Sequence, residues 1–199
     1  MGDIIYTYKN QVYANITNKC DCACTFCIRS QTNAIGEATS LWHEKDPSLE
    51  EIIAVIDSFD IEPYEEFVFC GYGEPTCELD RLIAVGKYVK EKTGLPIRLN
   101  TNGLGNLYHK RDIIPELATV VDSISISMNA ADSESYEKVT RPSFENAYEA
   151  MLDFAEECKE HGLKTQLSIV DVLSPEEINR CREIADNRGV YLKVRHFTE

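Results

Sequence analysis

The chain has 199 residues, with 34 acidic against 20 basic side chains and a formal net charge of −14. This length suits a single domain over residues 1–199, and the charge argues against a protein that coats nucleic acid or an anionic membrane. The N-terminus lacks the basic and apolar regions of a signal peptide, and no apolar run reaches membrane-spanning length. We therefore expect a cytoplasmic protein with no membrane partner, whose eight cysteines suit metal binding better than disulfides.

Apolar periodicity predicts strands that alternate with helices along most of the chain. In chain order the expected elements are strand Val12–Thr17, helix Ser48–Phe59, strand Glu66–Cys70, helix Leu79–Lys92, strand Ile97–Asn100, helix Arg111–Ala118, strand Ser123–Ser127, a short helical turn Ser133–Val139, helix Phe144–His161, strand Lys164–Val170, helix Pro175–Asn187 and strand Val190–His196. Strands connected through helices form a parallel sheet of right-handed units, so the pattern predicts an α/β fold.

The expected strands alternate polar and apolar residues, whereas parallel strands buried on both faces are apolar throughout. Since side chains alternate between faces, the polar residues should share one concave face. They are Asn15, Asn100, Ser125, Ser127, Gln166, Ser168 and Arg195. A closed eight-stranded barrel fills its interior with apolar side chains. A polar lining on six strands instead predicts a partial (β/α)6 barrel, open on one side, that holds a polar ligand. An antiparallel sheet with one solvated face is the alternative, which the long helical connections disfavour.

Three cysteines, Cys20, Cys24 and Cys27, follow the first expected strand with the spacing C-x3-C-x2-C. Thiolates are soft ligands that select iron–sulfur clusters, zinc or Cu(I). Three of them can hold three irons of a four-iron cluster and leave the fourth open to another ligand. A zinc site that also uses Cys22 is the weaker interpretation, because zinc sites usually take two separated C-x2-C pairs. We interpret Cys22 as a loop residue outside the triad.

This spacing, with Phe26 directly before the third cysteine, resembles the signature of the radical S-adenosylmethionine (SAM) superfamily. The resemblance implies a radical SAM core fold and a [4Fe-4S] cluster held by Cys20, Cys24 and Cys27, with Phe26 beside the cofactors. It also implies that SAM binds the open iron and is cleaved reductively to a 5′-deoxyadenosyl radical, which abstracts hydrogen from a substrate.

The segment Gly71-Tyr72-Gly73-Glu74-Pro75 follows the second expected strand and resembles the superfamily's "GGEP" motif. Tyr72 stands where the family has its first glycine, a change that backbone contacts can survive. The resemblance implies that Gly71, Tyr72, Gly73 and Glu74 receive the amino group of SAM. A tight turn is the ordinary interpretation of such a glycine pair.

Three further segments resemble SAM-binding positions of the superfamily. Asn100 and Asn102 belong to a TNG-like segment after the third expected strand, and Ser127 ends the fourth. Arg141 falls where related enzymes place an arginine near the SAM carboxylate. The plain alternatives are an Asn-Gly turn and a surface arginine.

The resemblance extends from Val12 to His196, and within the superfamily the motifs look most like the small TatD-associated radical SAM proteins. That resemblance implies no settled substrate. It implies an electron donor such as flavodoxin or ferredoxin as a partner. Because the chain ends with the last expected strand, we expect no added substrate domain. A protein or nucleic-acid substrate could then close the open barrel, as in small activating enzymes that install a radical on a partner protein. The loop Ser30–Pro47, with Trp42 as a lid aromatic, could instead close over a small metabolite.

The remaining candidates carry less information. His196 lies at the end of the last expected strand and could contact substrate, while His43, His109 and His161 are expected in solvated positions. A rival function of another class is a non-catalytic iron–sulfur or zinc module. Such a module does not need the glycine motif, the TNG-like segment and the polar strand face together, so the sequence favours the enzyme.

Overall fold

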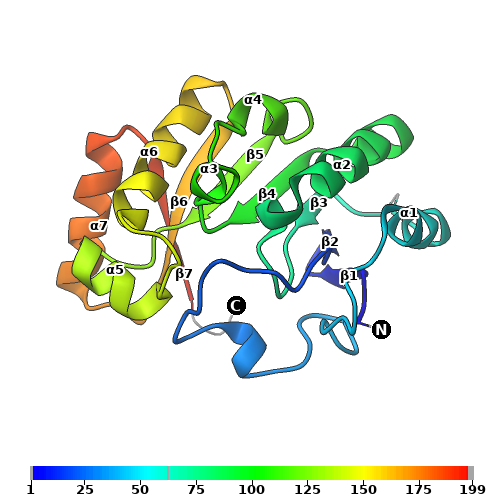
Figure 1. Cartoon of the computed structure of the whole chain (residues 1–199), viewed down its shortest axis with the longest axis horizontal. Helices are drawn as coiled ribbons and strands as arrows, with labels where there is room; N and C mark the ends of the chain where they lie inside the picture. The colour runs from blue at the N-terminus through cyan, green and yellow to red at the C-terminus, as the bar shows by residue number, and fades with distance from the viewer. Residues whose placement is uncertain (1, 62, 197–199) are drawn as a thin grey trace.

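The structure is a computed structural model that describes residues 2–61 and 63–196. Its strands are β1 (Ile5–Tyr8), β2 (Gln11–Ala14), β3 (Glu66–Phe69), β4 (Ile97–Thr101), β5 (Ser123–Ser127), β6 (Lys164–Val170) and β7 (Tyr191–Arg195). Its helices are α1 (Leu49–Ser58), α2 (Leu79–Thr93), α3 (Gly105–His109), α4 (Ile114–Leu117), α5 (Ser133–Thr140), α6 (Ala147–Glu160) and α7 (Pro175–Asn187). Figure 1 shows a curved sheet with helices along its outer side and the segment after β2 crossing the opposite side.

The seven strands form one sheet in chain order, from β1 to β7. The strands from β2 to β7 pair in parallel, as the sequence predicts. Since β1 and β7 are the two edges, the sheet does not close on itself. The structure therefore confirms the α/β partial barrel, open on one side.

Strand β1 is an addition that the sequence analysis did not predict. It pairs with β2 in antiparallel register, with Tyr8 opposite Gln11, so Lys9 and Asn10 make a two-residue hairpin loop. Lys9 has a φ of 55°, in the left-handed region that such tight hairpin turns use. The six parallel strands are thus extended by one short antiparallel edge strand.

Two helix boundaries differ from the sequence prediction for local reasons. The expected helix Phe144–His161 begins only at Ala147, because Asn146 has a φ of 55° and interrupts the helical backbone. The expected helix Arg111–Ala118 is the shorter α4, which is preceded by α3. In contrast, α1 begins as expected, directly after Ser48, which forms a capping box: Glu51 N donates to Ser48 Oγ at 3.2 Å.

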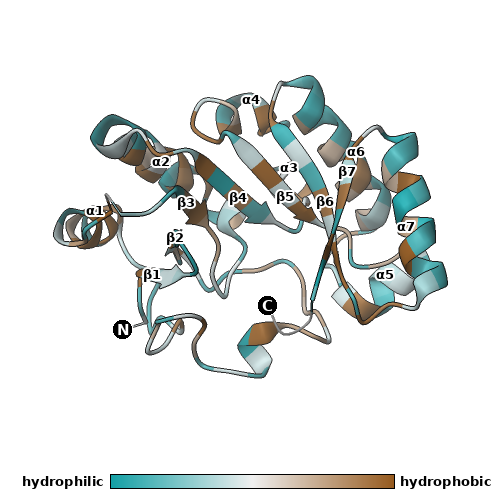
Figure 2. Cartoon of the chain, turned by 180° about the vertical axis from the view of Figure 1, so that it is seen from behind, coloured by the Kyte–Doolittle hydropathy of each residue, from teal (hydrophilic) through white to brown (hydrophobic). Residues whose placement is uncertain are grey.

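The two faces of the sheet differ as the alternation predicts. Ile124 and Ile126 of β5 are buried in the main hydrophobic core under the helices, and Ser125 and Ser127 point to the concave side. The hydropathy colouring of Figure 2 shows the alternation along the strands from behind. None of the helices in the described ranges combines the length and the apolar character needed to span a bilayer.

Candidate functional site

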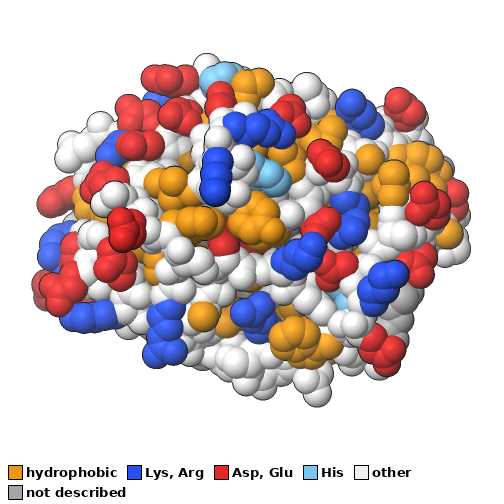
Figure 3. Space-filling model, in the orientation of Figure 1, with side chains coloured by type: hydrophobic (Ala, Val, Ile, Leu, Met, Phe, Trp, Pro, Cys, Tyr) orange, Lys and Arg blue, Asp and Glu red, His pale blue; other side chains and the backbone are white. Residues whose placement is uncertain are grey.

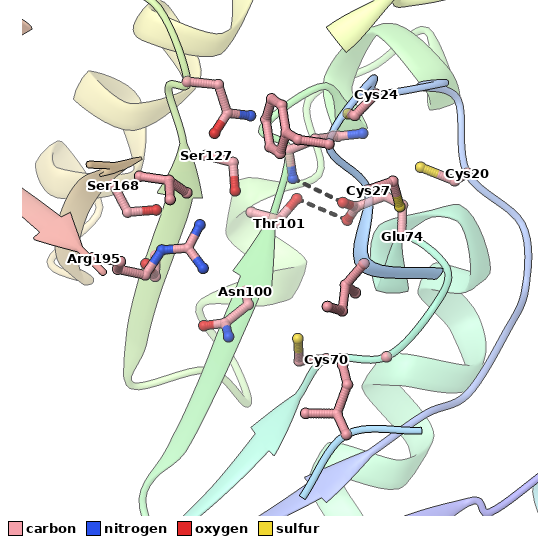
Figure 4. Close-up of a pocket in the computed structure, with 18 of the residues that line it drawn as sticks. Cys20, Cys24, Cys27, Cys70, Glu74, Asn100, Thr101, Ser127, Ser168 and Arg195 are labelled. Carbon is pink, nitrogen blue, oxygen red and sulfur yellow. Dashed lines mark hydrogen bonds between the residues drawn. The ribbon is translucent and has the colours of Figure 1, made fainter. Parts of the chain in front are cut away.

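A cavity of about 600 Å³ lies on the concave side of the sheet, within the size range of small-molecule sites. Its walls include all three cysteines of the triad and the ends of β4 to β7. The polar residues that strand parity assigns to one face line it together: Asn100, Ser125, Ser127, Gln166, Ser168 and Arg195. Figure 4 shows Cys20, Cys24 and Cys27 on one side of this space and Ser127, Ser168 and Arg195 on the other. The predicted shared polar face is confirmed for these six residues.

Asn15 is an exception to the predicted polar lining. It is fully buried, its Nδ2 donates to Leu41 O at 2.8 Å, and its Oδ1 accepts from Tyr72 N at 3.2 Å. A Cβ on Gly71 would overlap this amide. The prediction that Asn15 faces the ligand cavity is therefore wrong, because its side chain ties together the chain segments behind the glycine motif.

The cysteine loop is fixed at several points by hydrogen bonds. Ala23 N donates to Thr140 O at 3.0 Å, and Thr25 N donates to Val139 O at 2.8 Å, so the loop lies along the end of α5. At its start, Thr17 Oγ1 donates to an Asp46 carboxylate oxygen at 2.7 Å. These hydrogen bonds tie the loop to the end of α5 and to Asp46.

The three thiols of the triad line the same cavity, although they are not gathered into a closed metal-binding group within the described residues. Burial raises the pKa of Cys20 to about 12, followed by the effect of nearby Glu74. A hydrogen bond from the Cys22 thiol lowers the pKa of Cys24. Three soft sulfur donors on one loop, opening into a cavity with polar walls, fit a cluster that keeps one iron accessible.

Cys22 is more than an exposed loop residue. Only 5% of it is exposed, it joins the main hydrophobic core, and its sulfur lies 3.5 Å from Asn102 Nδ2. Its backbone forms an isolated bridge with Pro142. These contacts give Cys22 a structural role in seating the loop.

The glycine motif lies directly against the start of the cysteine loop. A Cβ on Gly73 would overlap Thr17 O, and Glu74 N donates to Lys19 O at 2.7 Å. The Tyr72 ring is outside the cavity lining and packs edge-on against Trp42 at 5.1 Å between centroids. Position 73 therefore needs a glycine because the glycine motif and the start of the cysteine loop approach too closely for a side chain.

The Glu74 carboxylate is buried at the junction of the two motifs. Oε1 accepts from Thr76 N, from the Thr76 hydroxyl and, at 2.7 Å, from the Thr101 hydroxyl, while Oε2 accepts from Asn102 N at 2.8 Å. Burial, followed by the nearby charge of Asp21, raises the pKa of Glu74 to about 7. Figure 4 shows this carboxylate held against β4, next to the cysteines.

The family model of the radical SAM superfamily matches residues 14–186. The chain belongs to the radical SAM superfamily. Its members are enzymes, and membership implies SAM and a [4Fe-4S] cluster as cofactors. Comparison with curated protein sequences gives no match.

The fold resembles solved radical SAM structures at low sequence identity. SuiB from Streptococcus suis is 16% identical with a TM-score of 0.65 over 91% of this chain. Methylornithine synthase (PylB) is 15% identical with a TM-score of 0.66 over 94%. The enzyme anSMEcpe with bound SAM is 15% identical with a TM-score of 0.63 over 92%. This chain spans only 38%, 53% and 50% of those three chains, respectively.

Asp21 is a buried acidic residue beside the cavity that the sequence analysis missed. It lies inside the cysteine motif, is only 7% exposed, and accepts a short hydrogen bond from Asn102 Nδ2. Its Oδ2 has no partner among the described residues, and burial raises its pKa. An acidic residue between two cysteines was visible in the sequence, but nothing local indicated that it is buried.

The remaining predicted residues are divided between the cavity and its surroundings. Phe26, Asn102 and His196 line the radical SAM cavity, and His196 pairs with Asp171 at 2.7 Å. Arg141 is exposed and outside the lining, with a φ of 46° at the end of α5. Its backbone carbonyl accepts from Ala23 N at 3.3 Å, so it contacts the cysteine loop through the main chain.

The histidine predictions were only partly right. His161 is exposed, as predicted, but His43 is 5% exposed and bonds Asn15 O through Nε2 at 2.9 Å. His109 is half-buried and bonds Thr76 O at 2.7 Å. The prediction that His43 and His109 are solvated is thus wrong, because both rings form hydrogen bonds with backbone carbonyls near the glycine motif.

Proposed function

We propose that this chain is a radical SAM enzyme built as one core domain over residues 1–199, with Cys20, Cys24 and Cys27 as cluster ligands. When bound, the reduced cluster supplies the electron that cleaves SAM to methionine and a 5′-deoxyadenosyl radical, which abstracts hydrogen from substrate. The protein's part is to hold the cofactors, orient SAM and exclude water.

In this proposal the SAM contacts come from the cysteine side of the cavity and the adjoining strand ends. The backbone of Gly71–Gly73 and the Glu74 carboxylate receive the SAM amino group. Phe26, Asn100, Asn102 and Ser127 contact the rest of SAM, and Arg141 acts near the SAM carboxylate if its side chain turns inward.

One observation carries the proposal: the thiol triad, the glycine motif and the polar strand ends line one cavity. Two buried amide oxygens of that lining, Asn100 Oδ1 and Asn129 Oδ1, have no hydrogen-bond partner among the described residues. Buried polar atoms without partners are costly, so a polar ligand in the cavity would satisfy them. A purely electron-transferring or structural metal module would have no use for such a lining.

The test is anaerobic reconstitution with iron and sulfide, reduction with dithionite, addition of SAM, and measurement of 5′-deoxyadenosine. We expect cleavage by the wild-type protein and none by Cys24→Ser. An intact cluster without any cleavage would favour the non-catalytic module. In the cell, we propose a cytoplasmic enzyme reduced by a flavodoxin or ferredoxin, which the same assay can examine by replacing dithionite with either donor.

A further inference from the structure

The charged residues around the cavity are unevenly distributed. The described lining contains three basic side chains, Arg98, Lys193 and Arg195, but one acidic side chain, Glu74, which lies on the cysteine side. The whole chain has a net charge of −14, and Figure 3 shows acidic side chains spread over one outer face. A basic cavity wall inside an acidic protein is a local feature that its overall composition does not explain.

Arg98 is already engaged by the protein. Its guanidinium pairs with Glu66 Oε2 at 3.1 Å and donates to Gln11 Oε1 at 2.8 Å. Its charge is therefore neutralised within the fold.

Arg195 differs from Arg98, because its side chain has no ion pair or hydrogen bond with any residue in the described ranges. The residue is half-buried, and its Nε is buried without a partner. A guanidinium presents five donors in a planar fork that matches a carboxylate or a phosphate. A buried donor of this kind is costly unless something occupies it.

Polar side chains lie around Arg195 on the concave face. In the parallel pairing of β6 and β7, Lys193 lies opposite Ser168 and Arg195 opposite Val170, so both basic side chains belong to the concave face. Figure 4 shows Arg195 extending toward Asn100, with Ser127 and Ser168 beside it, across the cavity from Cys20, Cys24 and Cys27. The wall thus offers charge, hydroxyls and an amide on one side of the space.

The cavity is covered on its open side by the segment after the cysteine loop. Five residues of that segment contribute to the lining: Ile28, Gln31, Thr32, Ala34 and Ile35. Trp42, the expected lid aromatic, is 40% exposed and packs on Tyr72 instead. The part of Ser30–Pro47 that borders the cavity is therefore its first part, and the cavity volume of about 600 Å³ suits a small molecule.

We propose that the β7 wall is the substrate site, with Arg195 anchoring the carboxylate or phosphate group of a small anionic substrate and Lys193 adding charge at the rim. This inference rests on the proposed function, since it assigns the part of the cavity opposite the cysteines to the substrate. It names a substrate class that neither the motifs nor the overall charge indicates.

The test uses the reconstituted protein with SAM bound, and titrates inorganic phosphate and succinate separately by calorimetry. We expect the wild type to bind at least one of the two, and the one bound identifies phosphate or carboxylate as the recognised group. Arg195→Gln should weaken that binding by about 10- to 100-fold, the loss typical of a charge-assisted hydrogen-bond pair. The Arg195→Lys variant keeps the positive charge but loses the planar guanidinium fork. Its anion affinity should lie between those of wild type and Arg195→Gln.

Arg182→Gln is the matched control, because Arg182 is exposed on α7 and away from the cavity lining. It should bind the anion like wild type. SAM affinity, measured in parallel, should be the same in Arg195→Gln and wild type. Circular dichroism of each variant confirms that it is folded, and Arg195→Lys keeps the test valid if the glutamine variant is not.

Three results would overturn the proposal. Wild-type protein that binds neither anion, or an Arg195→Gln variant that binds as tightly as wild type, removes the anion site. An anion that competes with SAM, together with weaker SAM binding in Arg195→Gln, would assign Arg195 to the SAM carboxylate instead. Failure of the proposed function is separate, because it would show as no SAM cleavage, while phosphate and succinate can still be titrated into SAM-free protein.

Discussion

Replacing Glu74 with glutamine should change how the stability of the cluster-free protein depends on pH. The pKa of Glu74 rises from an ordinary value of 4.5 to about 7 because the carboxylate is buried and Asp21 is near. The folded-state pKa therefore lies above the unfolded one, so the folded state holds the proton between these two values. Stability from this group is present at low pH and is lost as pH rises through about 7.

The size of the effect follows from the same values. At about 1.4 kcal/mol for each pH unit, the rise from 4.5 to about 7 corresponds to about 3 kcal/mol of unfolding free energy. Glutamine cannot ionise, but its NH2 group must face either Asn102 N or the donors on the Oε1 side. We expect it to lose about one backbone hydrogen bond, or about 1–2 kcal/mol, at low pH.

The assay is urea unfolding of both proteins from pH 5 to pH 8, without iron and under reducing conditions, followed by circular dichroism. At pH 5 the variant should be less stable than wild type. By pH 8 the difference in unfolding free energy should have moved by about 2 to 3 kcal/mol in favour of Glu74→Gln, because part of the change falls below pH 5. Asp21, whose pKa is also raised by burial, is present in both proteins, so its own titration cancels in this comparison. Glu44→Gln removes the same charge at an exposed position and should follow wild type.

This reasoning would be refuted if the difference in unfolding free energy between wild type and Glu74→Gln stayed constant from pH 5 to pH 8. It would mean that the carboxylate ionises in the folded protein as easily as in water, which the burial and the neighbouring charge do not allow.

Three other outcomes are expected. Serine at any position of the thiol triad should abolish the open-site cluster, measured by iron content and by the EPR signal with and without SAM. The Cys22→Ala variant should keep the cluster. A Cys22 variant that loses all iron would show that the triad is wrongly assigned. Gly73→Ala should lower both iron content and SAM affinity, because the new Cβ displaces Thr17; normal iron content in that variant would contradict the close contact. Ser174→Ala should lower the unfolding free energy by about 1 kcal/mol in urea titrations, since it removes the capping box of α7; an unchanged midpoint would mean that this helix end frays already.

Much of the cavity was predictable because strand parity is a local property. Once β5 and β6 were placed, the side of the sheet that Ser125 and Ser168 occupy followed from counting residues. The motif spacing likewise placed the three cysteines after the first parallel strand. Both kinds of signal are short in sequence, and neither depends on distant partners.

The misplaced residues depend on contacts between distant segments. Asn15 is polar and lies next to a strand, but its amide bonds to Leu41 and Tyr72, which no local pattern connects to it. His43 was expected in solvent and is instead buried against Asn15 O. The buried state of Asp21 has the same origin, because the end of α5 and Asn102 come from far along the chain. Burial of a polar loop residue is decided by what folds over it.

The charge distribution gives the two ends of the cavity different preferences. SAM carries a sulfonium and an ammonium, and the cysteine end holds the buried carboxylates of Glu74 and Asp21. The opposite end carries Arg195 and Lys193, which suit an anion. A cofactor with excess positive charge and a negatively charged substrate would then each be repelled from the other's end. If SAM binds at the thiols as proposed, the same charge distribution would hold an anionic substrate at the opposite end, facing SAM across the cavity.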